Sequence, residues 1–261
     1  SGPVTADGVA VSRILVTLRD AQGQPVAGVR PVVVASGTDN ILVQAGGTDG
    51  FGQAVATLSS TKAETKTLYV AAPAGFSSVT TTVDFVAGPP VPGNCTIAAT
   101  SPVVADHMSR STITVLIRDA FLNPVAGILP RFEASGSANS YIQPGVTSVY
   151  GRAEGSLMSS KAEIKTIRMT DPEGLESVSA LATFVPGPAF GPLSTLALPT
   201  TVVADDTDFA SVVVTLKDAQ GNPISGVTPV LSVTPMTGSS RAADRIVQPG
   251  PTDNLGTTVG Q

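Results

Sequence analysis

The chain has 261 residues and a net charge of −5, with no Trp, 3 Tyr and 8 Phe. The charge is spread along the sequence without a basic run, which argues against nucleic acid as a partner, because Lys and Arg must neutralise phosphates. The single cysteine, Cys95, excludes an intrachain disulfide. No apolar stretch approaches the roughly 18 residues of a membrane span, and no signal peptide is recognisable.

One stretch recurs at a fixed interval of 99 residues, at 14–28, 113–127 and 212–226. It reads ILVTLRDAQGQPVAG, ITVLIRDAFLNPVAG and VVVTLKDAQGNPISG. Repetition at a fixed period indicates tandem copies of one unit. A unit of this length lies near the common size of an independently folding domain, roughly 100–150 residues.

The first unit is expected at 1–88, with strands at 14–19, 29–35, 53–60, 67–72 and 79–86. Val and Thr dominate these segments and suit a pleated, half-buried surface. Asp20 opens a turn in which its carboxylate can accept backbone N–H groups, and Pro25 sets φ for the return of the chain. Pro31 stands near the start of the second strand and predicts an edge strand or a bulge.

The remaining chain divides into a linker at 89–93, a complete unit at 94–187, a second linker at 188–192 and a third unit at 193–261. Proline-rich linkers favour an extended, semi-rigid spacer. The second unit opens with a strand at 95–100 that the first unit lacks. The third carries its own opening strand at 193–198 and a six-residue insertion before Gln248, and it lacks the equivalents of the closing strands, so it is expected to be incomplete at its C-terminal end.

Short strands, turn signals every 8–12 residues and one unit per roughly 100 residues predict tandem immunoglobulin-like Greek-key β-sandwiches. The fold class is therefore all-β. Apolar residues alternate rather than following a helical period, which argues against helices.

Three sequence blocks resemble the bacterial immunoglobulin-like domain of the intimin and invasin group, often called Big-1. In the first unit they are DAQGQPVAGV, TDGFGQA and LSSTKA. The second unit departs from the pattern at Phe121-Leu122 and Thr147-Ser148, and the third lacks the last block. The resemblance covers nearly the whole chain.

The resemblance implies the stalk of a bacterial cell-surface adhesin, which is extracellular and associated with the outer membrane. A barrel anchor and a binding tip would lie outside this segment, as would contacts with a host receptor or glycan. The implied partners within reach are other copies or domains of the same protein. Domains of this family also occur in surface filaments and phage structural proteins.

No catalytic residue, cofactor or bound metal is expected, and the chain is not interpreted as an enzyme. Calcium needs six to eight oxygen ligands, and the one local cluster is Asp205, Asp206 and Asp208. The repeated Asp7, Asp106 and Asp205 are interpreted instead as residues that cap a bend. His107, the one histidine, is interpreted as a solvated loop residue, because near neighbours such as Asp106 cannot assemble a triad with it on one strand.

A contact site for another molecule is considered in the second unit. Phe121 and Leu122 place two apolar residues at a turn tip, where an exposed patch can mark an interaction site. Tyr141 and Tyr150 are the other aromatic candidates. Cys95 belongs to an apolar strand and is expected to be buried rather than paired with another chain.

Three functional hypotheses follow. The favoured one is a structural rod that projects a distal binding region from the cell. The second is a self-assembling filament or phage structural protein in which incomplete units are completed by strand exchange. The third is a glycan- or receptor-binding module, which predicts exposed aromatic residues gathered at one end of a sandwich.

Overall fold

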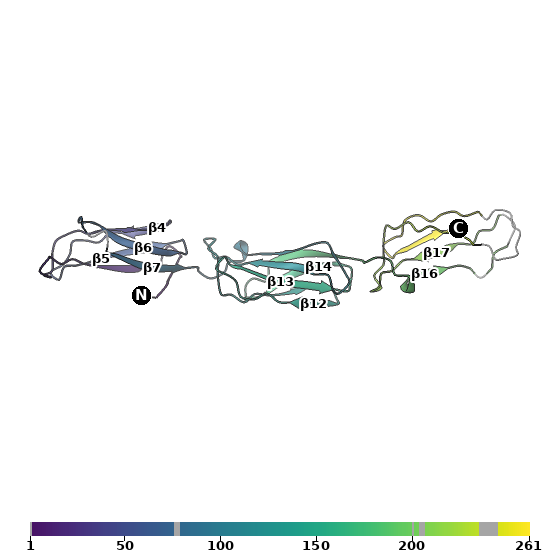
Figure 1. Cartoon of the computed structure of the whole chain (residues 1–261), viewed down its shortest axis with the longest axis horizontal. Helices are drawn as coiled ribbons and strands as arrows, with labels where there is room; N and C mark the ends of the chain where they lie inside the picture. Colours follow the sequence, from purple (N-terminus) through teal and green to yellow (C-terminus); the bar gives the residue numbers. More distant parts are fainter. Residues whose placement is uncertain (1, 76–78, 200, 204–206, 235–244) are drawn as a thin grey trace.

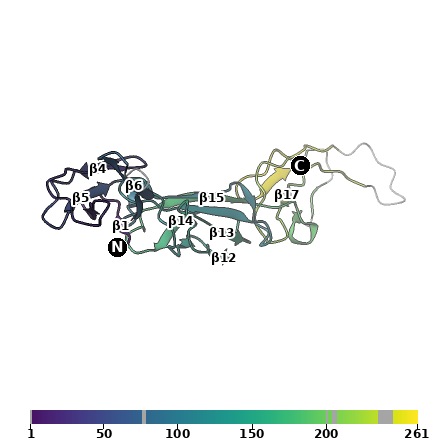
Figure 2. The same ribbon diagram turned by 60° about the vertical axis from the view of Figure 1, so that its left-hand side comes forward.

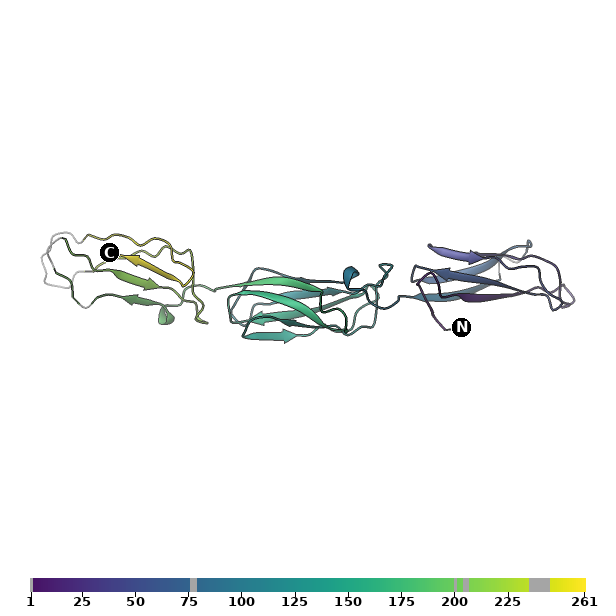
Figure 3. The same cartoon turned by 180° about the vertical axis from the view of Figure 1, so that it is seen from behind.

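The computed structural model describes residues 2–75, 79–199, 201–203, 207–234 and 245–261. It is built of three units that follow one another end to end, joined by single linker segments (Figures 1, 2 and 3). The all-β, immunoglobulin-like class predicted from the sequence is confirmed. The predicted unit limits remain a prediction. No helix within the described ranges is long and apolar enough to cross a membrane.

The first unit contains β1 (Val4–Thr5), β2 (Ser12–Thr17), β3 (Val32–Ala35), β4 (Asn40–Val43), β5 (Gln53–Ser60), β6 (Thr65–Ala72) and β7 (Thr80–Val86). The second contains the 3-10 turn η1 (Pro92–Asn94), β8 (Thr96–Ala99), β9 (Val103–Val104), β10 (Ser111–Leu116), β11 (Arg131–Ala134), β12 (Asn139–Ile142), β13 (Arg152–Ser159), β14 (Ile164–Asp171) and β15 (Ser179–Val185). The third contains η2 (Gly191–Leu193), β16 (Thr195–Ala197), β17 (Val212–Thr215) and β18 (Thr257–Gly260).

The second unit shows the complete design. One sheet has the strand order β8-β10-β13-β12 and the other β9-β15-β14-β11. All pairings are antiparallel except that of β9 with β15, where Val103 lies beside Phe184. Alternation along the strands turns one side chain in two inward, so the core fills the space between the sheets.

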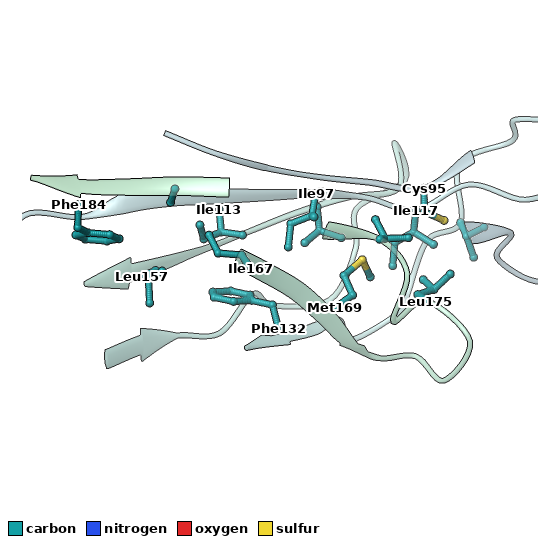
Figure 4. Close-up of a cluster of buried hydrophobic side chains, with 14 of the residues drawn as sticks. Cys95, Ile97, Ile113, Ile117, Phe132, Leu157, Ile167, Met169, Leu175 and Phe184 are labelled. Carbon is teal, nitrogen blue, oxygen red and sulfur yellow. The ribbon is translucent and has the colours of Figure 1, made fainter. Parts of the chain in front are cut away.

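The core of the second unit is continuous and apolar (Figure 4). Ile113, Leu157 and Ile167 are fully buried, and Phe184 closes the same cluster. Cys95, which directly precedes β8, also belongs to this cluster, so the expectation that it is buried is confirmed.

The first unit repeats this design with sheets β2-β5-β4 and β1-β7-β6-β3. Within the described part of the chain, no strand stands in the place of β8. β3 is an edge strand with a register shift between Val32 and Val33, which confirms the expectation drawn from Pro31. The third unit contributes one described sheet, in the order β16-β17-β18.

Candidate functional site: the domain junctions

The turn that follows β10 is organised by Asp119. Its Oδ1 accepts the backbone N–H groups of Phe121 and Asn123, at 2.8 and 2.9 Å. Such side-chain acceptors stabilise a turn by pairing amides that would otherwise be left without partners. The turn is thereby held as one rigid projection at the end of the second unit that faces the first.

The same turn reaches across to the first unit. Asp119 Oδ2 accepts the N–H of Gly88, at 2.9 Å, and also a bond from the Asn123 amide, at 2.9 Å. Asn123 Oδ1 accepts the N–H of Ala63, and Asn123 Nδ2 donates to the carbonyl of Thr61, both at 2.9 Å. We call Asp119 and Asn123 with these three backbone partners the Asp–Asn clamp.

The second junction repeats the clamp. Asp218 Oδ2 accepts the N–H of Gly187 at 2.9 Å. Asn222 accepts the N–H of Ala162 at 2.8 Å and donates to the carbonyl of Ser160 at 3.0 Å. The two aspartates and two asparagines of the clamps are at most 2% exposed. Separation of a junction would break three of these bonds per clamp and leave their six donor and acceptor groups to be resolvated.

Each linker is also bonded to the unit that it enters. The N–H of Val91 donates to the carbonyl of Arg118 at 2.9 Å, and the N–H of Phe190 donates to that of Lys217 at 2.8 Å. Asn94 adds a side-chain bond to the carbonyl of Asp119, at 2.7 Å. The linkers therefore do not act as free tethers.

The equivalent turn of the first unit has no clamp partner in the described part of the chain. Asp20 still holds its own turn, accepting the N–H groups of Gln22 and Gln24 at 3.0 and 2.8 Å. Both Asp20 and Gln24 are exposed. The turn motif is thus intrinsic to the unit, whereas the clamp also uses bonds to a neighbouring unit.

Burial of the Asp218 carboxylate by itself raises its pKa. The bonds that this carboxylate accepts from Asn222, from the Gly187 amide and from the amides of its own turn outweigh burial, so the pKa of Asp218 lies below its ordinary value. The ionised form of Asp218 therefore stabilises the second junction.

A buried lysine lies near each loop to which a clamp asparagine is hydrogen-bonded. Lys165 is fully buried, and its Nζ donates to Glu163 at 2.6 Å and to the carbonyl of Ser137 at 3.0 Å, 5.8 Å from the ring centre of Phe184. Lys66 and Glu64 repeat the pair in the first unit. The bond from the lysine lowers the pKa of Glu64 and of Glu163.

Glu64 and Glu163 face the buried lysines and are only 34% and 30% exposed. The residues that sequence reasoning missed are Lys66, Lys165, Asn123 and Asn222. The signal for the asparagines was visible, because Asn replaces Gln24 in both later copies of the turn.

The calcium candidates receive no structural account as a group. Asp205 and Asp206 lie outside the described residues, and Asp208 alone of the three lies within them. Within the described ranges, no group of three metal-ligating side chains comes together. The expectation that Asp205, Asp206 and Asp208 hold no metal stays a prediction.

The related aspartates of the first two units stabilise bends. Asp106 Oδ1 accepts the N–H groups of Met108 and Ser109, and Asp7 binds two amides in the same way. These backbone bonds lower the pKa of both carboxyls. Because Asp106 is engaged with Met108 and Ser109, it does not orient the ring of His107, which contacts Ser140 Oγ at 3.2 Å.

The proposed contact residues fall into two places. Phe121 and Leu122 lie on the clamp turn and are 46% and 57% exposed. Tyr150 is 77% exposed and lies on the turn at 148–151, which is bonded to the start of the clamp turn through the Ile117 N–H and the Gly151 carbonyl. Tyr141 pairs with Leu157 of β13. Leu157 lies about 17 Å along this strand from Arg152, which follows the turn at 148–151, at ~3.4 Å per residue.

Tyr141 is engaged within its own unit. Its ring meets Phe132 edge to face at 5.8 Å, and its hydroxyl donates to the carbonyl of Ala134. Residues equivalent to Tyr150 are exposed in the other units as well, namely Phe51 and Leu255. Phe121, Leu122 and Tyr150 therefore share one end of the second unit, and Tyr141 does not join them.

The fold and the junctions together define a class of protein: a tandem array of immunoglobulin-like β-sandwiches whose units are clamped end to end. Residues 1–86 match the family model of the bacterial Ig-like domain (group 1). The first unit therefore belongs to that family, and the resemblance drawn from the sequence is confirmed.

A curated relative is the inverse autotransporter adhesin YeeJ of Escherichia coli (strain K12), which is 29% identical over 139 residues. The match spans 52% of this chain and 6% of that protein. The chain thus matches only a small part of the length of this relative.

Three solved structures share the fold. The Escherichia coli adhesin FdeC is 20% identical, with a TM-score of 0.71 over 99% of this chain and 83% of that one. Yersinia pseudotuberculosis InvD is 24% identical, with a TM-score of 0.65 over 86% and 70% of the two chains. Invasin, described as a bacterial integrin-binding protein, is 19% identical, with a TM-score of 0.58 over 99% and 52%.

Proposed function

We propose that this chain is a stalk segment of a bacterial cell-surface adhesin, extracellular and associated with the outer membrane, that holds a distal binding region away from the cell. The observation that carries the proposal is the repetition of the Asp–Asn clamp at both junctions with the same donors and acceptors. A rod needs the same stiff joint at each step, and two buried side chains supply it here.

The mechanism is mechanical rather than catalytic. The first and second units each keep their own core, so a load passes from unit to unit through the linker and the clamp. Bending at a junction would separate the clamp asparagine from the loop of the preceding unit and expose buried polar groups to water. A host receptor or glycan would be bound by other regions of the full protein, and no cofactor is required.

The clamp can be tested by measuring how widely the first two units vary in relative position. Spin labels are attached through Val43→Cys and Leu181→Cys, which replace side chains 61% and 63% exposed on the first and second unit. In the parent chain we expect a narrow distribution of label distances. Asn123→Ala should broaden it, because removing the side chain leaves the Ala63 amide and the Thr61 carbonyl unpaired, at a cost of about 1–3 kcal/mol.

Gln24→Ala is the matched control, since it truncates the equivalent residue at an exposed position. It should leave the distribution unchanged. A distribution that is already broad in the parent chain, or one that Asn123→Ala does not widen, would contradict the stalk mechanism.

A binding module is the second candidate, because Phe121, Leu122 and Tyr150 gather at one end of the second unit. Exposed aromatic and apolar residues at a loop cluster are typical of a recognition surface. Screening the chain against immobilised glycans and host-cell surface proteins tests this. Binding that Tyr150→Ser abolishes, with the label distances unchanged, would favour the module over the stalk.

A further inference from the structure

The first unit carries an apolar cluster on the outer face of the sheet β2-β5-β4. Leu15 of β2 pairs with Val55 of β5, and Val43 of β4 pairs with Thr57, two residues from Val55 on the same face. Ile41 lies two residues before Val43 and therefore points to the same side. The four aliphatic side chains are between 40% and 61% exposed. They are contiguous, because paired and diagonal neighbours on a sheet face lie within about 8 Å of one another.

The third unit repeats this surface. Val213 pairs with Val259 at the equivalent positions of the repeat, and Val247, which exchanges backbone bonds with Gln261, corresponds to Val43. Val247 and Val259 are 45% and 52% exposed, and Val213 is half-buried. The outer face of the same sheet is therefore apolar in the first and third units.

In the second unit the equivalent face is largely polar. The positions of the Leu15–Val55 pair carry Thr114 and Glu154, which pair with each other in the same way. Exposed apolar side chains lie instead on the other sheet of this unit, at Ile164 of β14 and Leu181 of β15. In the first unit, those two positions hold threonines, Thr65 and Thr82. The apolar outer face thus changes sheet between the first and second units and changes back in the third.

This change of sheet follows the way in which the units are rotated. Figure 1 shows β4 at the upper edge of the first unit, its equivalent β12 at the lower edge of the second, and β18 above β17 in the third. The second unit is therefore turned over about the long axis relative to both neighbours, and it presents its other sheet to the side on which they present theirs. The apolar faces around Val55, Leu181 and Val259 lie along one side of the rod, which we call the apolar side.

The extent of the apolar side indicates what kind of partner covers it. A face of three strands and three outward rows measures roughly 15 by 20 Å, or about 300 Å². Packing one such face on another buries about 600 Å² in total, which is below the roughly 1,200–2,000 Å² of a specific interface. A partner that matches all three faces buries about 1,800 Å². That partner must carry apolar faces at the spacing of these units, and a second copy of this chain carries them at that spacing.

We propose that two copies of this chain associate side by side, in parallel, through their apolar sides. The parallel direction rests on the proposed stalk function, because stalks rooted in one membrane point the same way. A twofold axis along the rod places each unit against the same unit of the other copy. Val55 lies on the middle strand of its face, so the two Val55 side chains meet near the axis. Arg13, on the outer face of β2, then lies over β4 of the other copy, and the two guanidinium groups stay apart.

Sedimentation equilibrium of the full chain between roughly 10 µM and 1 mM tests the association. The average mass should rise from 26.2 kDa toward twice that value as the concentration increases. Val55→Glu should weaken the dimer roughly tenfold or more, because two carboxylates would be buried against each other without compensation. The second unit carries Glu154 at the equivalent position, so the substitution suits the fold. Val259→Glu should weaken the dimer in the same way, because the third unit contributes a face of its own.

Thr82→Glu is the matched control. It places the same charge at an exposed strand position of the first unit, on the opposite side of the rod, and should leave the association unchanged. Cross-linking gives a second readout, since a short bismaleimide can span the roughly 10 Å between packed sheets. It should join Val55→Cys chains into covalent dimers and leave Thr82→Cys chains as monomers.

Three outcomes would overturn the proposal: a chain that stays at 26.2 kDa throughout, a dimer that Thr82→Glu weakens as much as Val55→Glu, or a dimer in which Val55→Cys chains do not cross-link. None of them contradicts the stalk function, which is tested within a single chain. Because Val43 and Leu181 lie on the apolar side, the label distances of that test are measured at a concentration where the chain is monomeric. Broad label distances there would contradict the stalk mechanism and leave the association standing.

Discussion

In each closed junction, the clamp asparagine is held by the aspartate of its own turn. Asn123 and Asn222 place an amide close to the turn, where Asp119 and Asp218 orient it. Gln24 carries one more methylene at the same place and is exposed. An asparagine held by an aspartate loses less rotamer freedom on docking than a longer and freer glutamine would. The clamp is therefore preorganised before the neighbouring unit arrives.

The buried lysines make a second residue-scale prediction. Glu163→Gln removes the charge that balances Lys165 while keeping the shape of the side chain. An uncompensated buried ammonium is costly, so we expect the second unit to lose about 1–3 kcal/mol of unfolding free energy, with partial exposure of Glu163 reducing the loss. Hydrogen exchange resolved by residue measures this unit by unit.

Glu154→Gln is the control for that experiment. Glu154 is 52% exposed and its ion-pair partner Arg152 is 57% exposed. Because exposed ion pairs contribute little, the variant should change the free energy of unfolding by less than about 0.5 kcal/mol. Equal effects of Glu163→Gln and Glu154→Gln would show that the buried pair contributes no more than a surface one. The first unit, which neither substitution touches, provides the internal reference.

At the scale of elements, two turns stack at the end of each unit that bears the clamp turn. Gly151 has φ +70°, and a Cβ there would clash with the Ile117 carbonyl oxygen and lie 3.2 Å from Pro124 Cα. Gly52 and Gly256 occupy the same position in the other units. Only glycine allows the turn at 148–151 to lie this close to the base of the clamp turn.

Gly151→Ala should therefore destabilise the second unit and loosen its clamp turn. A left-handed backbone costs a non-glycine residue about 1–2 kcal/mol, and the clash adds to that. Gly145→Ala, where a Cβ meets nothing within 4 Å, should change stability by no more than about 0.5 kcal/mol. Thermal unfolding of both variants decides, and indistinguishable midpoints would refute the close-approach argument.

Much of this architecture was visible in the sequence, and the reasons for the misses are physical. The alternation of 53–60 gave β5 its bounds, and the Pro31 signal located an irregular edge in β3. β1 and β9 were missed because a two-residue strand has no period to detect. The clamp was missed because a turn by itself already explains an Asn in it. The partners of this Asn also lie far away in the sequence: the N–H of Ala63, which donates to Asn123 Oδ1, is 60 residues earlier in the chain.

At the scale of the whole molecule, the lowered pKa of Asp218 links the straightness of the rod to pH. The bond from the Gly187 amide, which Asp218 accepts only across the clamped junction, favours the carboxylate anion, and the pKa of Asp218 in the clamped junction lies below the ordinary Asp value of about 3.9. The contribution of Asp218 to clamping is thus fully present above that pH and is lost as the pH falls through the lower, clamped pKa.

Small-angle scattering between pH 7 and pH 2.5 tests this at the second junction. We expect the parent chain to keep its maximum dimension down to about pH 4 and then to show bent conformers. Asp218→Asn should show them already at pH 7, because an amide nitrogen in place of Oδ2 would face the Gly187 N–H and the Asn222 amide, two donors without an acceptor. Circular dichroism at each pH separates bending from unfolding of the units. If Asp218→Asn is as straight as the parent at neutral pH, the negative charge at this position does not hold the junction closed, and the stiffness must come from the linker bond of Phe190 to Lys217.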